Sequence, residues 1–315
     1  MSSAFPSPAD PAADPAADPA ADPASPAPVR VGLIGAGPWA RDMHAPMLAA
    51  GPETTLTAVW ARRPDAAATL ARAHRAVVAD SPEELFDRCE AVAFAVPPAV
   101  QAQLAVRAAQ AGKALLLDKP LGADLAGARA VAEAVAAYGV VSQMVLTKRY
   151  HPATRDFLAA ARRIEVTGAR SCYLHGAFLG GEMATGWRLT EGALLDLGPH
   201  LLDLLDTAVG PIAALRATGD PRRWVELTCE HENGAVSQAS LSGAVRLPRA
   251  RTRVELLGPA QELTWDSEGA SHRESWPLLR AEFAAAVRSG VPGPLDAARG
   301  LRLQELIAAA GRFLP

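Results

Sequence analysis

From residue 29 onward, short apolar runs alternate with longer segments in which apolar residues recur at helical spacing. The runs AVAFAV and ALLL are apolar at consecutive positions, which is typical of strands covered on both faces. Strands that alternate with helices in this way indicate parallel strands joined by helical crossovers, so the pattern predicts an α/β, doubly wound parallel sheet. Its strands are expected at 29–34, 55–60, 90–96, 114–117 and 140–146, and its helices at 38–50, 65–74, 99–111 and 121–138.

After about residue 152 the pattern changes, because strand-like stretches follow one another with few helices between them. Such an order favours an antiparallel sheet. The second part of the chain is therefore predicted to be α+β, with an open, mainly antiparallel sheet. Its strands are expected at 166–178, 214–218, 224–230, 235–241 and 251–257, and its helices at 153–163, 194–208, 277–288 and 295–311.

The first 28 residues show neither pattern. They hold eight of the 26 prolines and ten alanines, repeat the unit ADPA, and contain no Lys, Arg or Glu. The prolines exclude a regular helix, and there is little apolar surface to bury. We predict a disordered arm at 1–28, a doubly wound domain at 29–148 and a second domain at 149–315. An arm that wraps around another subunit is the alternative for 1–28.

Composition excludes several classes of function. The net charge is −3 over 315 residues and no basic block stands out, so we expect no nucleic-acid partner. No apolar run approaches the roughly 20 residues of a membrane span, and the N-terminus does not resemble a secretory signal. Cys89, Cys172 and Cys229 are odd in number and far apart, so they form neither a disulfide framework nor a metal knuckle. The sequence therefore predicts a cytoplasmic protein without a membrane or metal site.

The segment VGLIGAGPWA (31–40) follows the first strand and opens the first helix. Gly35 permits a tight turn, Gly37 lets backbone amides approach a pyrophosphate, and Ala40 is small. A GxGxx[GA] match at the first strand–helix turn indicates a Rossmann dinucleotide-binding site. A tight turn made for packing and an S-adenosylmethionine site are the alternatives.

The end of the second strand bears on the choice of cofactor. NAD sites usually place Asp or Glu there to bind the ribose hydroxyls. This chain reads AVWARRPD (58–65), with Arg62 and Arg63 after the strand and no acid at its end. Paired guanidinium groups suit a 2′-phosphate, so we predict NADP, with NAD as the second choice. The alternative is a pair of solvated arginines without a role.

Only three of the 31 cationic residues are lysines: Lys113, Lys119 and Lys148. Lys119 lies in LLLDKPLG (115–122), directly after a buried strand and at the edge where doubly wound sheets bind ligands. An ammonium group there can hydrogen-bond a carbonyl and stabilise developing negative charge. Lys148 also follows a strand, but beside Arg149 it is interpreted as a surface residue.

The segment EGALLDLGPHLLDLL (191–205) places Asp196 and His200 four residues apart, on one face of a predicted helix. A carboxylate and an imidazole one turn apart can act as a general acid–base pair. Pro199 then lies in the first turn or produces a kink. A capped helix with a buried histidine is the alternative, and no third ligand at suitable spacing supports a metal site.

In this order, the motifs resemble the Gfo/Idh/MocA family of NAD(P)-dependent oxidoreductases, which includes glucose–fructose oxidoreductase and inositol dehydrogenase. The resemblance covers about residues 29–313 and rests on GAGPWA (35–40), HAPML (44–48), AVPPAVQ (95–101), AGKALLLDKP (111–120), KRYHPA (148–153) and GALLDLGPHLLDLL (192–205). It implies a Rossmann domain followed by an α+β domain with an open antiparallel sheet. We expect a homo-oligomer, a dimer or tetramer, formed through that sheet.

The resemblance also implies site residues. Lys119, Asp196 and His200 are catalytic, with His200 as the acid/base. Gln101 stands where many members have His, and Asp118 replaces the usual Glu before the Lys-Pro pair. The cofactor-binding residues are Gly35, Gly37, Pro38, Trp39, Arg62, Arg63, Val96, Pro97, Pro98, Gln101, Asp118 and Lys119. The substrate-binding residues are Arg149, Tyr150, Trp187 and Arg188.

The expected activity is hydride transfer between NADP and a carbinol or carbonyl carbon of a sugar, a sugar derivative or a cyclic polyol. Lys119 polarises the oxygen, and His200, held by Asp196, exchanges its proton. Two alternatives stay open. One is a non-redox enzyme of the same fold that uses bound NAD transiently, in elimination–addition at a glycoside. The other is a cofactor-binding regulator.

Overall fold

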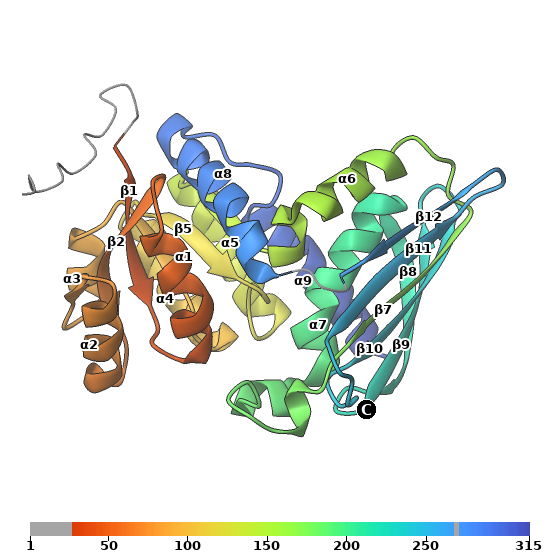
Figure 1. The fold of residues 1–315 in the computed structure, drawn as a ribbon, viewed down its shortest axis with the longest axis horizontal. Coiled ribbons are helices and arrows are strands. Elements are labelled where there is room, and N and C mark those ends of the chain that lie inside the picture. Colours follow the sequence, from red (N-terminus) through yellow and green to blue (C-terminus); the bar gives the residue numbers. More distant parts are fainter. Residues whose placement is uncertain (1–26, 268–270) are drawn as a thin grey trace, which may run out of the picture.

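The computed structural model describes residues 27–267 and 271–315. Two six-stranded sheets lie at opposite ends of the molecule, and helices α7 (Gly186–Ala208) and α9 (Ala297–Gly311) run between them (Figure 1). The predicted arm lies outside the described residues except for Ala27 and Pro28. Among the residues that the structure describes, no helix has both the length and the apolar character needed to cross a membrane.

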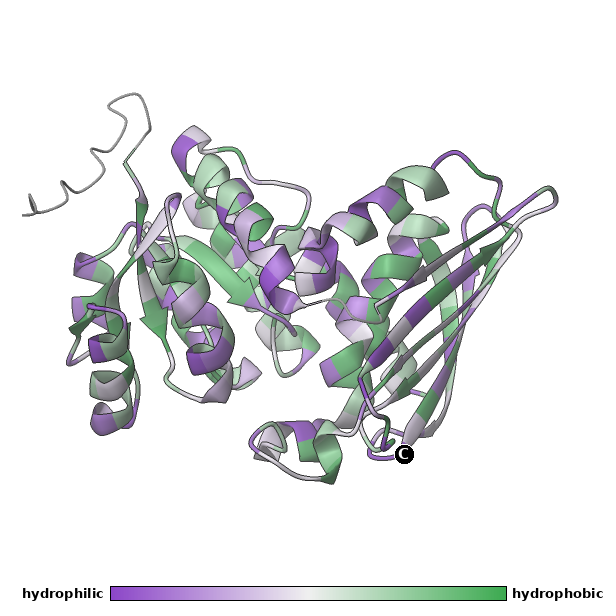
Figure 2. Cartoon of the chain, viewed as in Figure 1, coloured by the Kyte–Doolittle hydropathy of each residue, from purple (hydrophilic) through white to green (hydrophobic). Residues whose placement is uncertain are grey.

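The first sheet is parallel throughout, with the strand order β3-β2-β1-β4-β5-β6. Every residue of β4, β5 and β6 is buried, which agrees with the apolar runs in the sequence and with the apolar central strands in Figure 2. The doubly wound prediction is therefore confirmed. The strands are β1 (Val29–Ile34), β2 (Thr54–Trp60), β3 (Val77–Val78), β4 (Ala91–Phe94), β5 (Ala114–Asp118) and β6 (Ser142–Val145). The helices are α1 (Ala45–Ala49), α2 (Pro64–Ala73), α3 (Pro82–Asp87), α4 (Pro98–Gln110) and α5 (Leu125–Tyr138).

The first predicted helix contains a π-helical segment, η1 (Ala40–His44), directly before α1. Pro46 lies one residue into α1 and has no N–H to donate to the preceding turn. The amide of Ala45 instead donates to the carbonyl of Ala40, five residues back. The sequence pattern misses β3 and α3, because a two-residue strand and a six-residue helix are too short to show a period.

The second sheet has the order β12-β11-β7-β10-β9-β8, and all its neighbours pair antiparallel except β7 and β10. Its mainly antiparallel character is confirmed. Exposed and buried residues alternate strictly along β9, because one face lies against helices while the other faces solvent. Self-association through that open face stays a prediction. The elements are α6 (Pro152–Ala161), β7 (Gly168–Leu174), β8 (Ile212–Asp220), β9 (Trp224–His231), β10 (Val236–Ser242), β11 (Arg251–Leu257) and β12 (Glu262–Asp266).

The C-terminal helices return to the first sheet (Figure 1). At the edge strand β6, the amide of Met144 donates to the carbonyl of Leu295 at 2.6 Å. On α8 (Trp276–Ser289), Arg280 Nε donates to Glu53 Oε2 at 3.0 Å. The last residues of the predicted second domain thus pack against the first, and the boundary between residues 148 and 149 stays a prediction.

Candidate functional site

Three adjoining cavities follow the carboxyl edge of the first sheet, where the strand order reverses between β1 and β4. The glycine cavity, about 790 Å³, lies between Gly35–Gly37 and Arg62–Arg63. The proline cavity, about 640 Å³, lies beside Val96–Pro98. The histidine cavity, about 580 Å³, contains His175, His200 and His272. The glycine and proline cavities are lined by all of the predicted cofactor-binding residues: Gly35, Gly37, Pro38, Trp39, Arg62, Arg63, Val96, Pro97, Pro98, Gln101, Asp118 and Lys119.

The two glycines of the first turn differ in what the protein requires of them. Gly35 has φ of +122°, and an added Cβ would lie 2.3 Å from the carbonyl oxygen of Ala95, so the fold itself needs glycine there. At Gly37 an added Cβ would meet nothing within 4 Å. The open space at Gly37 faces the glycine and proline cavities, which is the cradle that a dinucleotide pyrophosphate fits.

Arg62 and Arg63 lie between the end of β2 and the start of α2, and both are exposed. Among the described residues neither forms an ion pair, so both guanidinium groups are available to a ligand of the glycine cavity. The arrangement leaves room for a phosphate at this end of the groove.

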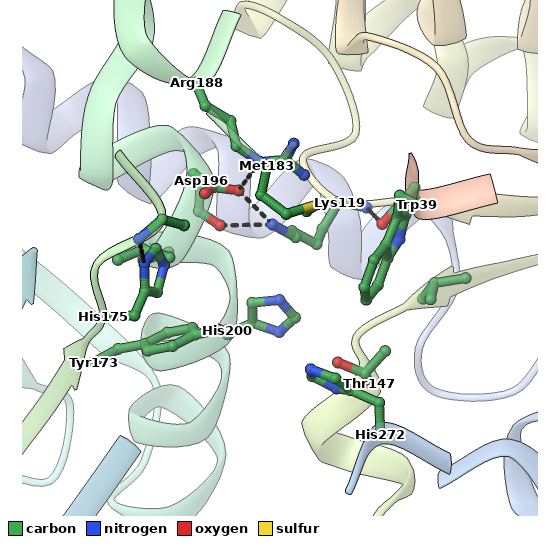
Figure 3. Close-up of a pocket in the computed structure, with 14 residues that line it drawn as sticks. Trp39, Lys119, Thr147, Tyr173, His175, Met183, Arg188, Asp196, His200 and His272 are labelled. Atoms are coloured by element: carbon green, nitrogen blue, oxygen red, sulfur yellow. Dashed lines mark hydrogen bonds and ion pairs between the residues drawn. The ribbon is translucent and has the colours of Figure 1, made fainter. Parts of the chain in front are cut away.

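Lys119 joins the two halves of the site. Its Nζ donates to the Asp196 carboxylate Oδ1 at 2.7 Å and to the Asp196 backbone carbonyl at 2.8 Å (Figure 3). Arg188 Nε also donates to Asp196 Oδ1, at 3.3 Å. Burial raises the pKa of Asp196, but the charges of Lys119 and Arg188 outweigh burial and hold its pKa below the usual range. The carboxylate therefore stays ionised between two cations.

Gln101 lines the proline cavity, and its side chain also forms hydrogen bonds within the protein. Its amide nitrogen donates to the carbonyls of Asp118, Pro120 and Leu121, and its oxygen accepts from the Asp118 amide at 2.8 Å. Its side chain therefore fixes the turn that carries Lys119, and only 1% of Gln101 is exposed. Asp118 accepts from the backbone amide of Lys119 and lies 3.3 Å from His44 Nε2.

The predicted pairing of Asp196 with His200 is wrong. Asp196 is committed to Lys119 and Arg188, and His200 Nδ1 is buried with no hydrogen-bond partner among the described residues. Helical spacing places Asp196 and His200 on one face of the helix, but Lys119, which follows β5, binds the Asp196 carboxylate instead. Burial, followed by the charges of Lys119 and Lys148, holds the pKa of His200 well below its usual range, so the imidazole is neutral.

Several residues of the histidine cavity were not singled out in the sequence. Figure 3 shows the His200 ring between Tyr173 and His175 on one side and Thr147 and His272 on the other. Burial lowers the pKa of His175 to about 4, and its Nδ1 accepts from the Ala177 amide at 3.0 Å. These residues lie in segments without a recognisable motif, and only their residue type offered a signal. Lys148 was misread as a surface residue: its Nζ lies 4.2 Å from the centre of the Tyr173 ring.

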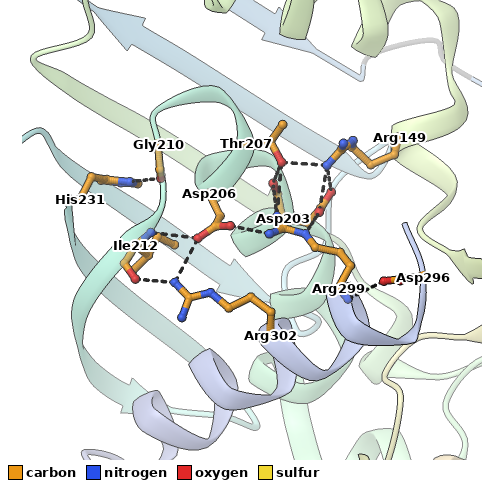
Figure 4. Close-up of polar contacts among 10 residues, drawn as sticks. All are labelled: Arg149, Asp203, Asp206, Thr207, Gly210, Ile212, His231, Asp296, Arg299 and Arg302. Atoms are coloured by element: carbon orange, nitrogen blue, oxygen red, sulfur yellow. Dashed lines mark hydrogen bonds and ion pairs between the residues drawn. The ribbon is translucent and has the colours of Figure 1, made fainter. Parts of the chain in front are cut away.

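Arg149 and Tyr150 do not reach this cavity, which corrects their predicted role as substrate-binding residues. Tyr150 is fully buried and donates to the Met144 carbonyl at 3.1 Å. Arg149 Nη1 binds both carboxylate oxygens of Asp203 (Figure 4). The other two predicted substrate residues, Trp187 and Arg188, do line the cavities.

Figure 4 shows a buried aspartate–arginine network in which α7 supplies the acids and α9 two of the cations. Arg299 Nε donates to Asp203 Oδ1 at 2.7 Å and also binds Asp206. Asp206 accepts from the Ile212 amide at 2.8 Å, and Arg302 donates to the Ile212 carbonyl at 2.5 Å. Asp203 is 0% exposed, so its charge depends on Arg149 and Arg299. The network fixes the helix that carries Asp196 and His200.

Helix α7 is two helical segments that meet at Gly192, which has φ of +77°. An added Cβ at Gly192 would lie 2.4 Å from the Pro221 carbonyl oxygen, so the break requires glycine. The second segment therefore starts at Ala193, and Pro199 lies in its second turn. Of the two possibilities predicted for Pro199, the first turn or a kink, the first-turn position does not hold, because the helix breaks at Gly192, before Asp196.

Comparisons with known proteins agree with this architecture. Residues 29–146 match "Oxidoreductase family, NAD-binding Rossmann fold", and residues 155–263 match "GFO/IDH/MocA C-terminal domain". The dTDP-3,4-didehydro-2,6-dideoxy-alpha-D-glucose 3-reductase of Streptomyces violaceoruber is 25% identical over 292 residues, which cover 91% of this chain and 80% of the relative.

Two solved structures share the fold. GenD2 from gentamicin A biosynthesis, in complex with NAD, has a TM-score of 0.81 at 24% identity, covering 91% of this chain and 94% of its own. Levoglucosan dehydrogenase, in complex with NADH and L-sorbose, has a TM-score of 0.80 at 19% identity, covering 90% of this chain and 96% of its own.

The two glycines give the first test. Gly37→Ala should change the free energy of unfolding by less than about 1 kcal/mol, because nothing in the protein occupies the space. The same variant should raise the Kd of the dinucleotide at least about tenfold, since the methyl group fills the cradle. Gly35→Ala is the contrast and should destabilise the fold by about 1–3 kcal/mol. Urea unfolding and fluorescence titration measure both; unchanged cofactor affinity in Gly37→Ala would contradict the assignment.

The aspartate–arginine network gives the second test. Asp203→Ala should lower the free energy of unfolding by about 3–5 kcal/mol, because it leaves the largely buried Arg149 without its carboxylate and removes one of the two carboxylates of Arg299. Asp156→Ala on α6 is the control, because Asp156 is exposed, and a change within about 0.5 kcal/mol is expected there. Equal stability of the two variants in urea unfolding would mean that the network does not hold α7.

Proposed function

The chain belongs to the GFO/IDH/MocA family of oxidoreductases, and from this membership we propose that it transfers hydride between NADP and a carbinol or carbonyl carbon of a sugar or sugar derivative. One observation carries the proposal. Lys119, Asp196 and His200 come from two different parts of the chain and meet in the histidine cavity, which adjoins the dinucleotide cradle.

Lys119 is suited to the oxygen of the reacting carbon. An ammonium group has three N–H donors, and two of those on Lys119 bind Asp196. The third is free to donate to a substrate oxygen, where it stabilises negative charge. Asp196 thus orients Lys119 rather than His200, and it acts as a positioning residue.

His200 is suited to the proton of the reacting hydroxyl. When bound, the nicotinamide ring supplies or accepts the hydride. The neutral imidazole of His200 is ready at pH 7 to accept the hydroxyl proton as the carbinol is oxidised. The rings of Tyr173, His175 and His272 line this part of the cavity around His200.

The substrate class follows from the relatives and from the cavity. The relatives are named as a dTDP-sugar 3-reductase and a levoglucosan dehydrogenase. A cavity of about 580 Å³ lined by Lys, Arg, Asp and His side chains suits a polyhydroxylated ring of similar chemistry. Arg62 and Arg63 support NADP over NAD, since neither has an acidic partner within residues 27–267 and 271–315 and no acid ends β2.

The catalytic assignment is tested by kinetics on a panel of sugars followed at 340 nm. His200→Ala should lower kcat by about 10²–10⁴-fold, the usual contribution of a positioned acid or base. Lys119→Ala should lower kcat by a comparable factor. Asp196→Asn should lower kcat less, because this substitution only allows Lys119 to move. The thermal stability and cofactor affinity of His200→Ala should stay near those of the parent.

The pH profile supplies a second readout. Alcohol oxidation should stay level between pH 6 and 8 as far as His200 is concerned, and should fall only on further acidification, as His200 takes up a proton. His74→Ala on the far end of α2 is the matched control and should keep full activity. Full turnover in a folded His200→Ala protein refutes the mechanism. Retained cofactor with product formed and no absorbance change points to the non-redox alternative.

The cofactor preference is tested by binding. Replacing Arg62 and Arg63 by Ala should weaken the binding of NADPH by about 1.5–3 kcal/mol for each charge-assisted contact that is lost. The binding of NADH should not change. Arg63 precedes α2 without a capping hydrogen bond from its side chain, so the helix should not lose a cap. Arg72→Ala, later on the same helix, is the control. Equal losses for both cofactors, or tighter NADH binding in the parent, exclude the preference.

A further inference from the structure

Residues 180–191, which we call the flap, lie where the proline cavity meets the histidine cavity. Met183 and Arg188 line both cavities, while Thr185 and Trp187 line the proline cavity alone. Figure 3 shows Met183 and Arg188 together on one side of the histidine cavity. The flap therefore forms part of the wall at the join between the cofactor cradle and the proposed catalytic groups.

The flap has little of its own to hold it in place. None of its residues is buried, and Trp187 packs against the hydrophobic core as a partly buried side chain. Gly180 and Gly181 begin the flap with φ of +144° and +86°, and Gly192, directly after it, has φ of +77°. A segment with few buried contacts opens at a low free energy, and small residues at its ends are suited to act as hinges.

Two polar contacts join the flap to the elements below it. Arg188 Nε donates to Asp196 Oδ1 at 3.3 Å, and the same oxygen accepts from Lys119 at 2.7 Å. Glu182 forms an ion pair with Arg41 of η1, the segment that follows the glycine turn of the first sheet. Lifting the flap would take Arg188 away from Asp196, so the position of the flap is coupled to the groups that hold Lys119.

We propose that the flap is a lid that opens to admit and release the dinucleotide, and that the ion pair between Arg41 and Glu182 is its latch. The inference rests on the proposed oxidoreductase function and adds how the cofactor enters and leaves. The proline cavity lies between the flap and the loops at Gly37 and at residues 96–98. A dinucleotide that occupies this cavity therefore lies under the flap, and its exchange and its reaction belong to two different positions of the lid.

The test closes the lid with a cleavable cross-link. Arg41→Cys and Glu182→Cys are combined in the full-length protein, and a bismaleimide with a disulfide in its spacer joins the two thiols. Stopped-flow fluorescence of NADPH measures the rates of association and release. Cross-linked without cofactor, the protein should bind NADPH at least about 100-fold more slowly than the parent. Cross-linked with NADPH bound, it should release NADPH more slowly by a similar factor, and reduction of the spacer should restore both rates. The parent treated with the same reagent controls for reaction at Cys172, which is partly exposed.

The latch is tested without a cross-link. Glu182→Gln should release NADPH about 1.5- to 5-fold faster, since an exposed ion pair contributes little. Glu83→Gln is the matched control, because Glu83 forms a similarly exposed ion pair with Arg107 away from the flap. The control should release NADPH at the parent rate.

Hydrogen exchange of the unmodified parent decides where a variant does not fold. Amides of the flap should exchange at least about tenfold more slowly with NADPH bound than without it. Unchanged exchange, parent rates in the cross-linked protein, failure of the two cysteines to join, or equal effects of Glu182→Gln and Glu83→Gln overturns the inference. Trapped NADPH without turnover of any sugar refutes the proposed function and leaves the lid standing, whereas binding of neither NADPH nor NADH overturns both.

Discussion

The ion pair between Lys119 and Asp196 is the contact on which the site depends. Lys119 follows the last residue of β5, a strand of the first sheet. Asp196 lies on helix α7, which packs against the second sheet. Both side chains are largely buried, at 11% and 5% exposure, so neither charge can be left alone without a large cost. The pair therefore fixes the relative position of the cradle and the histidine cavity, and it determines that His200 remains free of the carboxylate.

Support for that pair is distributed over polar groups of several other elements. Gln101 bonds the turn before Pro120 from one side, and the aspartate–arginine network holds α7 from the other. The geometry of Lys119 and Asp196 thus depends on residues in α4 and α9 as well. Preorganisation of this kind keeps the Lys119 ammonium group in place without a ligand.

The sequence predicted the features that depend on neighbours along the chain. The strand–glycine–helix turn, the buried strands and the position of Lys119 at the end of β5 all follow from local pattern. The hydrogen-bond partners of the side chains did not follow from local pattern. Helical spacing predicted a pair of Asp196 and His200, whereas the Asp196 carboxylate binds Lys119, 77 residues earlier in the chain. Arg149 and Lys148 are adjacent in sequence, yet Arg149 binds Asp203 in a buried network and Lys148 lies over the ring of Tyr173. Such differences arise from packing between elements, which no single segment encodes.

The edge strand β6 is covered by the segment around Leu295 and by α9, and this arrangement has a consequence for the synthesis of the chain. Met144 on this edge strand is bonded to Leu295, about 150 residues later, and α9 packs so closely that an added Cβ at Gly300 would meet Met144 at 2.8 Å. At 5–20 residues per second, the ribosome needs on the order of ten seconds to supply that cover. Until then the growing chain carries an open strand edge, which is a template for pairing with other chains. The residues that seal this edge of the first sheet are thus made long after the strand that they cover.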